Sequence, residues 1–198
     1  MGRTVIRPPL ILASTSPYRR ELLARLRLGF EAIAPGMDEE SIEGESASDQ
    51  ALRLALAKAQ AVAQQHPGAI VIGSDQVASA AGRVLGKPGD ATHCRAQLAS
   101  LSGQSAHFYT ACAVRSEGAG VRLAHVDTTT VRFRSLSPQE IERYIDCEHP
   151  YDCAGGFKAE GLGITLFEGI ESQDPTALIG LPLIWLAGAL RAVGYALP

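Results

Sequence analysis

The sequence predicts an α/β protein with a mixed β-sheet that is arranged in two lobes. The first part of the chain alternates short apolar runs with stretches of helical spacing, as βα units do. The middle of the chain instead holds two long runs, residues 107–114 and 121–133, that are rich in β-branched and aromatic residues and are joined by turn residues. Such runs form antiparallel strands, so the sheet combines both strand directions.

Length and composition predict one soluble domain over residues 1–198. Apolar residues make up 46% of the chain and charged residues 20%, a balance that excludes a disordered protein. The net charge of -3 argues against a nucleic-acid binder, which carries a basic face. No apolar run approaches the roughly 20 residues that span a bilayer, and residues 1–9 lack the apolar core of a signal peptide. We expect a cytoplasmic protein with free cysteine thiols and no membrane partner.

The first half of the chain predicts strands and helices from local signals. Ser16 is an N-cap followed by Pro17 at the first helical position, and a long Ala- and Leu-rich helix ends before His66-Pro67-Gly68. A polar, acidic loop covers residues 35–46, and a buried strand ends at residues 74–76. The expected strands cover residues 10–13, 30–34 and 69–73, the helices residues 18–26 and 47–65, and a hairpin residues 77–80 and 84–85.

The second half shows equally local signals. Asp90 can cap a helix over residues 91–101, and Ser137 with Glu140 forms a capping box that opens a helix to about Cys147. A Gly-rich loop follows at residues 154–156. A further strand is expected at residues 164–167, and a closing helix at residues 183–193.

The junction between the first strand and the first helix is a candidate phosphate site. A helix N-terminus presents unpaired N–H groups and the positive end of its dipole. Residues 14–20 add hydroxyl groups and two arginines, Arg19 and Arg20, and a guanidinium can grip two phosphate oxygens. The same residues also fit an ordinary Ser-Pro helix cap with surface arginines, because the Walker pattern is absent.

Asp75 follows an apolar strand, and in α/β sheets ligands bind at strand ends. A carboxylate there can hold a divalent metal or accept a proton from water. The alternative is a turn aspartate that bonds to its own backbone.

Two lysines are further candidates. Lys58 interrupts a helical stretch, residues 54–63, that is otherwise apolar and uncharged, which indicates either a partner or ligand or a snorkelling side chain. Lys87 is restricted by the proline after it and is either a phosphate-neutralising cation or a solvated lysine.

The loop over residues 154–161 is the last candidate. Its paired glycines let the backbone approach a ligand closely. Lys158 and Glu160 alternate, so on an extended segment both would face the same side. A plain flexible loop is the alternative.

Taken together and in this order, these stretches resemble the Maf family of nucleoside triphosphate pyrophosphatases over nearly the whole chain. The matching stretches are residues 10–20, Asp38-Glu39, the helix with Lys58, and residues 73–76, 86–88, 102–103 and 180–182. The resemblance implies a long mixed sheet flanked by helices, a cleft between two lobes, a shape related to inosine triphosphatases, and a homodimer.

The resemblance also implies roles for particular residues. Asp75 matches the proton acceptor that activates water, and with Glu39 it matches positions implicated in binding a divalent metal, Mg²⁺ or Mn²⁺. The positions implicated in holding the triphosphate are Ser14, Arg19, Lys58 and Lys87. The positions that tune substrate choice are Tyr18, Gln76 and Glu160, and Lys158 is an additional candidate.

Within the family the chain resembles the subgroup associated with 7-methyl-GTP. Gln76 stands where the dTTP/UTP subgroup has Thr, and Glu160 stands where it has Gln. Tyr18 keeps the aromatic character of the Trp expected in this subgroup. The implied activity is hydrolysis of 7-methyl-GTP between its α and β phosphates. The alternatives are a house-cleaning pyrophosphatase for other non-canonical nucleotides, such as inosine triphosphate, and a nucleotide-binding regulator of septation.

Overall fold

The computed structural model describes residues 8–198. The expectation that the chain starts without a signal peptide rests mainly on residues 1–7, which lie outside the described part. Among residues 8–198, no helix combines the length and the apolar character that crossing a bilayer requires.

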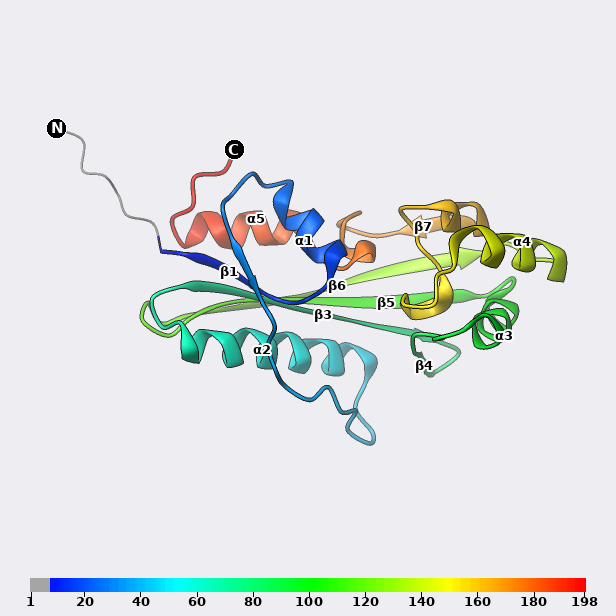
Figure 1. The fold of residues 1–198 in the computed structure, drawn as a ribbon, viewed down its shortest axis with the longest axis horizontal. Helices are drawn as coiled ribbons and strands as arrows, with labels where there is room; N and C mark the ends of the chain where they lie inside the picture. The colour runs from blue at the N-terminus through cyan, green and yellow to red at the C-terminus, as the bar shows by residue number, and fades with distance from the viewer. Residues whose placement is uncertain (1–7) are drawn as a thin grey trace.

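A seven-stranded mixed sheet forms the centre of the molecule (Figure 1). Its main path runs β2-β1-β3-β5-β6-β7, and β4 pairs with β3. The strand β1 is parallel to both of its neighbours, whereas every other pair is antiparallel, which confirms the predicted mixed sheet. The strands are β1 (Leu10–Ala13), β2 (Glu31–Ile33), β3 (Ile70–Ala80), β4 (Arg83–Leu85), β5 (Ser105–Ser116), β6 (Val121–Phe133) and β7 (Phe167–Glu171).

The helices begin where the predicted caps place them. The side chain of Ser16 accepts from the N–H of Arg19, Asp90 caps its helix in the same way, and Ser137 forms the expected capping box. The α-helices are α1 (Pro17–Ala24), α2 (Ala47–Gln65), α3 (Ala91–Leu101), α4 (Pro138–Glu148) and α5 (Leu183–Ala192). The short 3₁₀ helices within residues 8–198 are η1 (Ala154–Gly156), η2 (Leu162–Leu166) and η3 (Ala177–Ile179).

Helices cover both faces of the sheet at one end, and a second group gathers at the other end (Figure 1). The apolar faces of α1 and α5 pack against one side of β1, β3 and β5, while α2 packs against the opposite side. At the far end, α3 and α4 enclose a cluster around Phe108, Phe133 and Phe157. The strands β3, β5 and β6 run through both halves, as expected for two lobes on one sheet (Figure 1).

The strand that carries Asp75 is longer than predicted. The polar residues 74–76 suggested that it ends there, but β3 continues to Ala80 and pairs with β5 from Val71 to Ser79. Ser74 is accommodated inside the sheet because its Oγ donates to the carbonyl oxygens of Ala111 at 2.8 Å and Gly180 at 3.0 Å. The parallel partner β1 does end, at Ala13 opposite Gly73, so Asp75 lies just past the carboxyl end of β1.

The predicted strand over residues 164–167 is also wrong. Residues 162–166 form η2, and β7 begins only at Phe167. The glycine at 163 permits the tight turn, because a Cβ there would lie 2.4 Å from the carbonyl oxygen of Lys158.

Gly73 fixes the distance between β3 and α2, and we expect Gly73→Ala to destabilise the protein. A Cβ at this position would lie 2.3 Å from the carbonyl oxygen of Ala55 and 2.6 Å from the backbone nitrogen of Ala59. Because these are backbone atoms of α2, the helix must shift, at a cost of about 1–3 kcal/mol. Thermal or denaturant unfolding measures this loss. Gly29→Ala is the control, since a Cβ there meets nothing within 4 Å; equal stability of the two variants would contradict the tight contact.

Candidate active site

A cleft of about 510 Å³ lies where α1, β3, the β4 segment and η3 meet. The structure brings all the predicted site residues except Lys158 to its walls. These residues are Ser14, Tyr18, Arg19, Glu39, Lys58, Asp75, Gln76, Lys87 and Glu160. They come from segments far apart in the sequence, so folding gathers them.

A buried lysine between two carboxylates forms the centre of the cleft. The side chain of Lys58 is only 5% exposed, and its Nζ lies 2.6 Å from Asp75 Oδ1 and 2.7 Å from Glu39 Oε1. The sequence left open whether Lys58 has a partner or snorkels to the surface, and its burial excludes the second alternative. Since an isolated buried ammonium is costly, the two carboxylates stabilise its charged form.

Local packing explains why Lys58 and Asp75 meet. The residues of α2 that approach Gly73 are Ala55 and Ala59, so the turn that carries Lys58 is held against β3, and Asp75 lies two residues further along that strand. Only Oδ1 of Asp75 is hydrogen-bonded within residues 8–198. Within residues 8–198, every fully buried side-chain oxygen has a hydrogen-bond partner. Since Oδ2 has none, it is not fully buried, and it is open to the cleft that Asp75 lines. The carboxylate is therefore held at one oxygen and free to accept a hydrogen bond at the other.

Arg19 and Ser14 stand at the N-terminal end of α1. The Nε of Arg19 donates to the carbonyl oxygen of Gly180 at 3.0 Å, which fixes the guanidinium beside the cleft. Burial lowers the pKa of Arg19, while the charges of Asp75 and Glu39 act in the opposite direction. Ser14 Oγ accepts from the N–H of Ser16 at 3.1 Å, so its proton remains available to a ligand.

The amide of Gln76 is oriented by its surroundings. Its Nε2 donates toward Thr110 Oγ1 at 2.9 Å and toward the carbonyl oxygens of Ala177 and Leu178, both at 3.0 Å. Three acceptors around this atom identify it as the nitrogen. The oxygen, Oε1, has no hydrogen bond within the described residues, so Gln76 offers the cleft an acceptor.

Tyr18 contacts two further cleft residues, of which the sequence did not single out Asp152. Its hydroxyl donates to Asp152 Oδ2 at 3.5 Å and lies 3.8 Å from Cys153 Sγ. Burial, and then the neighbouring groups Cys153, Asp152 and Glu160, raise the pKa of Tyr18 above its ordinary value. Burial likewise raises the pKa of the Cys153 thiol to about 12, so it is not a thiolate nucleophile. The one feature of the sequence that could have pointed to Asp152 as a site residue is its position just before the Gly-rich loop at residues 154–156.

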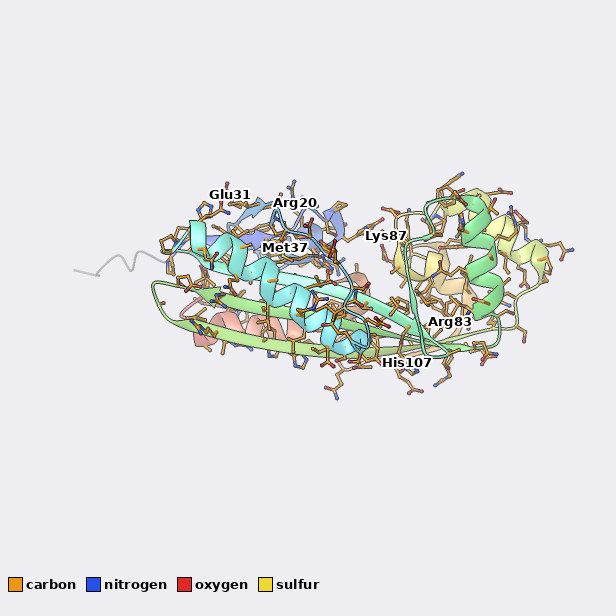
Figure 2. The ribbon with its side chains drawn as sticks, turned by 90° about the horizontal axis from the view of Figure 1, so that it is seen from below. Arg20, Glu31, Met37, Arg83, Lys87 and His107 are labelled. Carbon is orange, nitrogen blue, oxygen red and sulfur yellow. The ribbon has the colours of Figure 1, made fainter. Side chains whose placement is uncertain are left out.

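The two remaining lysines differ. Lys87 lines the cleft, makes no ion pair among residues 8–198, and stands between the two halves of the molecule (Figure 2). Lys158 is turned away, because its Nζ donates to the carbonyl oxygen of Glu148 at 3.3 Å and lies 3.8 Å from Glu148 Oε1. The expectation that Lys158 and Glu160 share one side of an extended segment is wrong, since residues 159–161 form a turn.

Three cationic side chains thus share one cleft beside the mixed sheet with a carboxylate that has one oxygen without a hydrogen bond among residues 8–198. Arg19, Lys58 and Lys87 supply positive charge, and the open oxygen of Asp75 lies among them. This combination defines an α/β protein whose cleft suits a polyanionic small molecule.

The family profile described as Maf-like protein matches residues 9–193, and the chain belongs to the Maf family. The resemblance found in the sequence is thereby confirmed.

Relatives of nearly equal length are named 7-methyl-GTP pyrophosphatase. The protein from Xanthomonas oryzae pv. oryzae is 56% identical over 96% of this chain and 100% of its own length. Those from Ralstonia nicotianae and Bordetella avium are 53% and 54% identical, over 97% and 94% of this chain and 99% and 94% of their own lengths. Among solved structures, the Ham1 protein of Staphylococcus aureus aligns with a TM-score of 0.46 and 15% identity over 64% of this chain and 72% of its own.

Proposed function

We propose that this chain hydrolyses a nucleoside triphosphate, with 7-methyl-GTP as the substrate, to the monophosphate and pyrophosphate. The observation that carries the proposal is the buried contact of Lys58 with Asp75, at 2.6 Å, in a cleft that also holds Arg19 and Lys87. The name shared by relatives that are 53–56% identical over almost their whole length supports both the activity and the substrate.

The reaction needs a water that attacks the α-phosphorus. As the new P–O bond forms, the bond from the α-phosphorus to the bridging oxygen breaks, and pyrophosphate leaves. Asp75 accepts the proton of the water at Oδ2, the oxygen that is open to the cleft, while Oδ1 stays hydrogen-bonded to Lys58. The carboxylate is thus oriented before substrate binds.

The cations stabilise the charge of the transition state. Phosphoryl transfer spreads negative charge over the phosphate oxygens, so positioning and electrostatic stabilisation dominate catalysis. Arg19 and Lys87 neutralise the leaving pyrophosphate, and the Ser14 hydroxyl and the N-terminus of α1 donate hydrogen bonds. Lys58 binds phosphate by exchanging its contact with Glu39, whose side chain is 54% exposed, for a substrate oxygen.

The carboxylates of Asp75 and Glu39 suit Mg²⁺ or Mn²⁺, which prefer hard oxygen ligands. No group of three or more His, Cys, Asp or Glu side chains within residues 8–198 is placed to hold a metal ion. The usual Mg²⁺ site uses one or two carboxylates together with water and substrate phosphates. When bound, the ion neutralises phosphate charge and lowers the pKa of water.

The part of the cleft that Tyr18, Gln76 and Glu160 line, here called the base end, suits guanine. Guanine carries two neighbouring donors, N1–H and the 2-amino group, which the carboxylate of Glu160 and the Oε1 of Gln76 can accept. Methylation at N7 makes the base cationic, so stacking on Tyr18 adds a cation–π attraction of about 0.5–2 kcal/mol.

A panel of nucleotides tests the proposal. We expect kcat/KM in the presence of Mg²⁺ to be highest for 7-methyl-GTP among 7-methyl-GTP, GTP, inosine triphosphate, dTTP and UTP. A preference for dTTP or UTP would overturn the substrate, and a preference for inosine triphosphate would favour a broader house-cleaning role. Tight nucleotide binding without any hydrolysis would instead favour a regulator of septation.

A further inference from the structure

We propose that Asp152 is a specificity-determining residue that makes the base end of the cleft select a cationic purine over a neutral one. This inference rests on the proposed function and adds a residue to it. The recognition is by charge, and it is separate from recognition of the guanine donors by Glu160.

The first observation is the position of Asp152. Both of its carboxylate oxygens contact cleft residues, because Oδ2 accepts from the Tyr18 hydroxyl at 3.5 Å and Oδ1 accepts from Cys153 Sγ at 3.5 Å. Asp152 itself lines the cleft. It therefore restrains the ring of Tyr18 and places a negative charge at the edge of that ring.

The second observation is how charges are distributed along the cleft. Its lining contains four carboxylates, Glu39, Asp75, Asp152 and Glu160. The first two are both ion-paired with Lys58, whereas Asp152 and Glu160 have no ion pair within residues 8–198. The unpaired carboxylates act on Tyr18, while the paired ones act on Arg19. Asp152 and Glu160 thus place negative charge beside the ring of Tyr18.

These features suit a flat cation with a phosphate chain. A purine methylated at N7 carries a positive charge that GTP lacks, so a base stacked on Tyr18 gains from the charge of Asp152 only when it is methylated. Because Asp152 is exposed, water screens this attraction and limits it to about 3–10-fold in affinity. The same screening predicts that selectivity falls as ionic strength rises.

Asp152→Asn tests the inference, because asparagine keeps the shape and the hydrogen bond but removes the charge. We expect the ratio of kcat/KM for 7-methyl-GTP to that for GTP to fall about 3–10-fold, through a higher KM for 7-methyl-GTP with kcat little changed. The salt dependence of that ratio should weaken as well. Asp146→Asn, which removes an exposed carboxylate outside the cleft, should change neither.

A ratio within twofold of the wild type would overturn the inference, and this includes an equal loss with both nucleotides. Tyr18→Phe separates charge from ring orientation, since it removes the hydroxyl and keeps the ring. If Asp152→Asn has no further effect in the Tyr18→Phe background, Asp152 acts through the hydroxyl and selection by charge is contradicted.

Equilibrium binding keeps this test independent of turnover. Dissociation constants of 7-methyl-GMP and GMP, measured by calorimetry, should show the same 3–10-fold loss of selectivity in Asp152→Asn. A wild-type protein that hydrolyses neither triphosphate contradicts the proposed function. An active wild type whose selectivity is unchanged by Asp152→Asn contradicts only the role of Asp152.

Discussion

Asp75→Asn should lower kcat for nucleoside triphosphate hydrolysis by about 10²–10⁴-fold while the fold stays intact. The amide oxygen can still accept from Lys58, but the side chain can no longer take a proton from water at the position of Oδ2. Lys58 keeps its contact with Glu39 at 2.7 Å, so the substitution leaves no buried ammonium without a carboxylate. Pyrophosphate release measures the activity, and thermal unfolding measures the fold.

A matched control for this variant is Asp127→Asn. Asp127 is also a buried strand aspartate, 4% exposed, but it lies on β6 and does not line the cleft. Its replacement should leave kcat close to that of the wild type. Near-normal turnover in Asp75→Asn would remove Asp75 from the mechanism.

Lys58→Met should damage both activity and stability. Activity falls because the variant loses a fixed cation for the triphosphate, which we expect to lower kcat/KM by about 10²–10³-fold. Stability falls because Asp75, whose side chain is 10% exposed, is left without its cation, at a cost of about 3 kcal/mol. Denaturant unfolding and steady-state kinetics measure the two effects.

The double variant Lys58→Met with Asp75→Asn separates them. Asp75→Asn removes the carboxylate charge that Lys58→Met leaves unpaired, so the double variant should regain most of the lost stability, because the effects of two contacting residues do not add. It should regain none of the activity. Arg122→Met, which removes an exposed cation on β6 outside the cleft, should resemble the wild type. Full activity in Lys58→Met would show that phosphate binding does not use this lysine.

Features fixed by neighbouring residues could be predicted from the sequence. The bounds of α2, residues 47–65, agree with the prediction because Ser46 caps one end and the Pro-Gly pair closes the other. The capping box at Ser137 likewise defines the start of α4. These signals act over three or four residues and need no tertiary contact.

Features that depend on long-range pairing could not be predicted. Residues 74–76 look like a strand end because they are polar, yet the carbonyl oxygens of distant Ala111 and Gly180 satisfy Ser74 inside the sheet. The ion pairs of Lys58 join the helix to a neighbouring strand and to an acidic loop, a juxtaposition that no local spacing encodes.

In the candidate site, too, residues in local motifs could be predicted from the sequence, whereas residues that depend on long-range contacts could not. The resemblance drew attention to residues 14–19 and to Asp75 and Gln76, and the structure places all of these on the walls of one cleft. Their roles in binding and catalysis stay predictions. It did not point to Asp152, whose role depends on the distant contact with Tyr18. The homodimer and the cytoplasmic location stay predictions of the sequence.

The most direct test of the account is the identity of the products formed from 7-methyl-GTP. Separation of the reaction mixture by ion-exchange chromatography, together with assays for pyrophosphate and phosphate, shows which anhydride linkage is cleaved. Cleavage between the α and β phosphates predicts 7-methyl-GMP and pyrophosphate in equal amounts from the first turnovers. Formation of 7-methyl-GDP and phosphate would contradict the account, because it requires cleavage of the linkage between the β and γ phosphates.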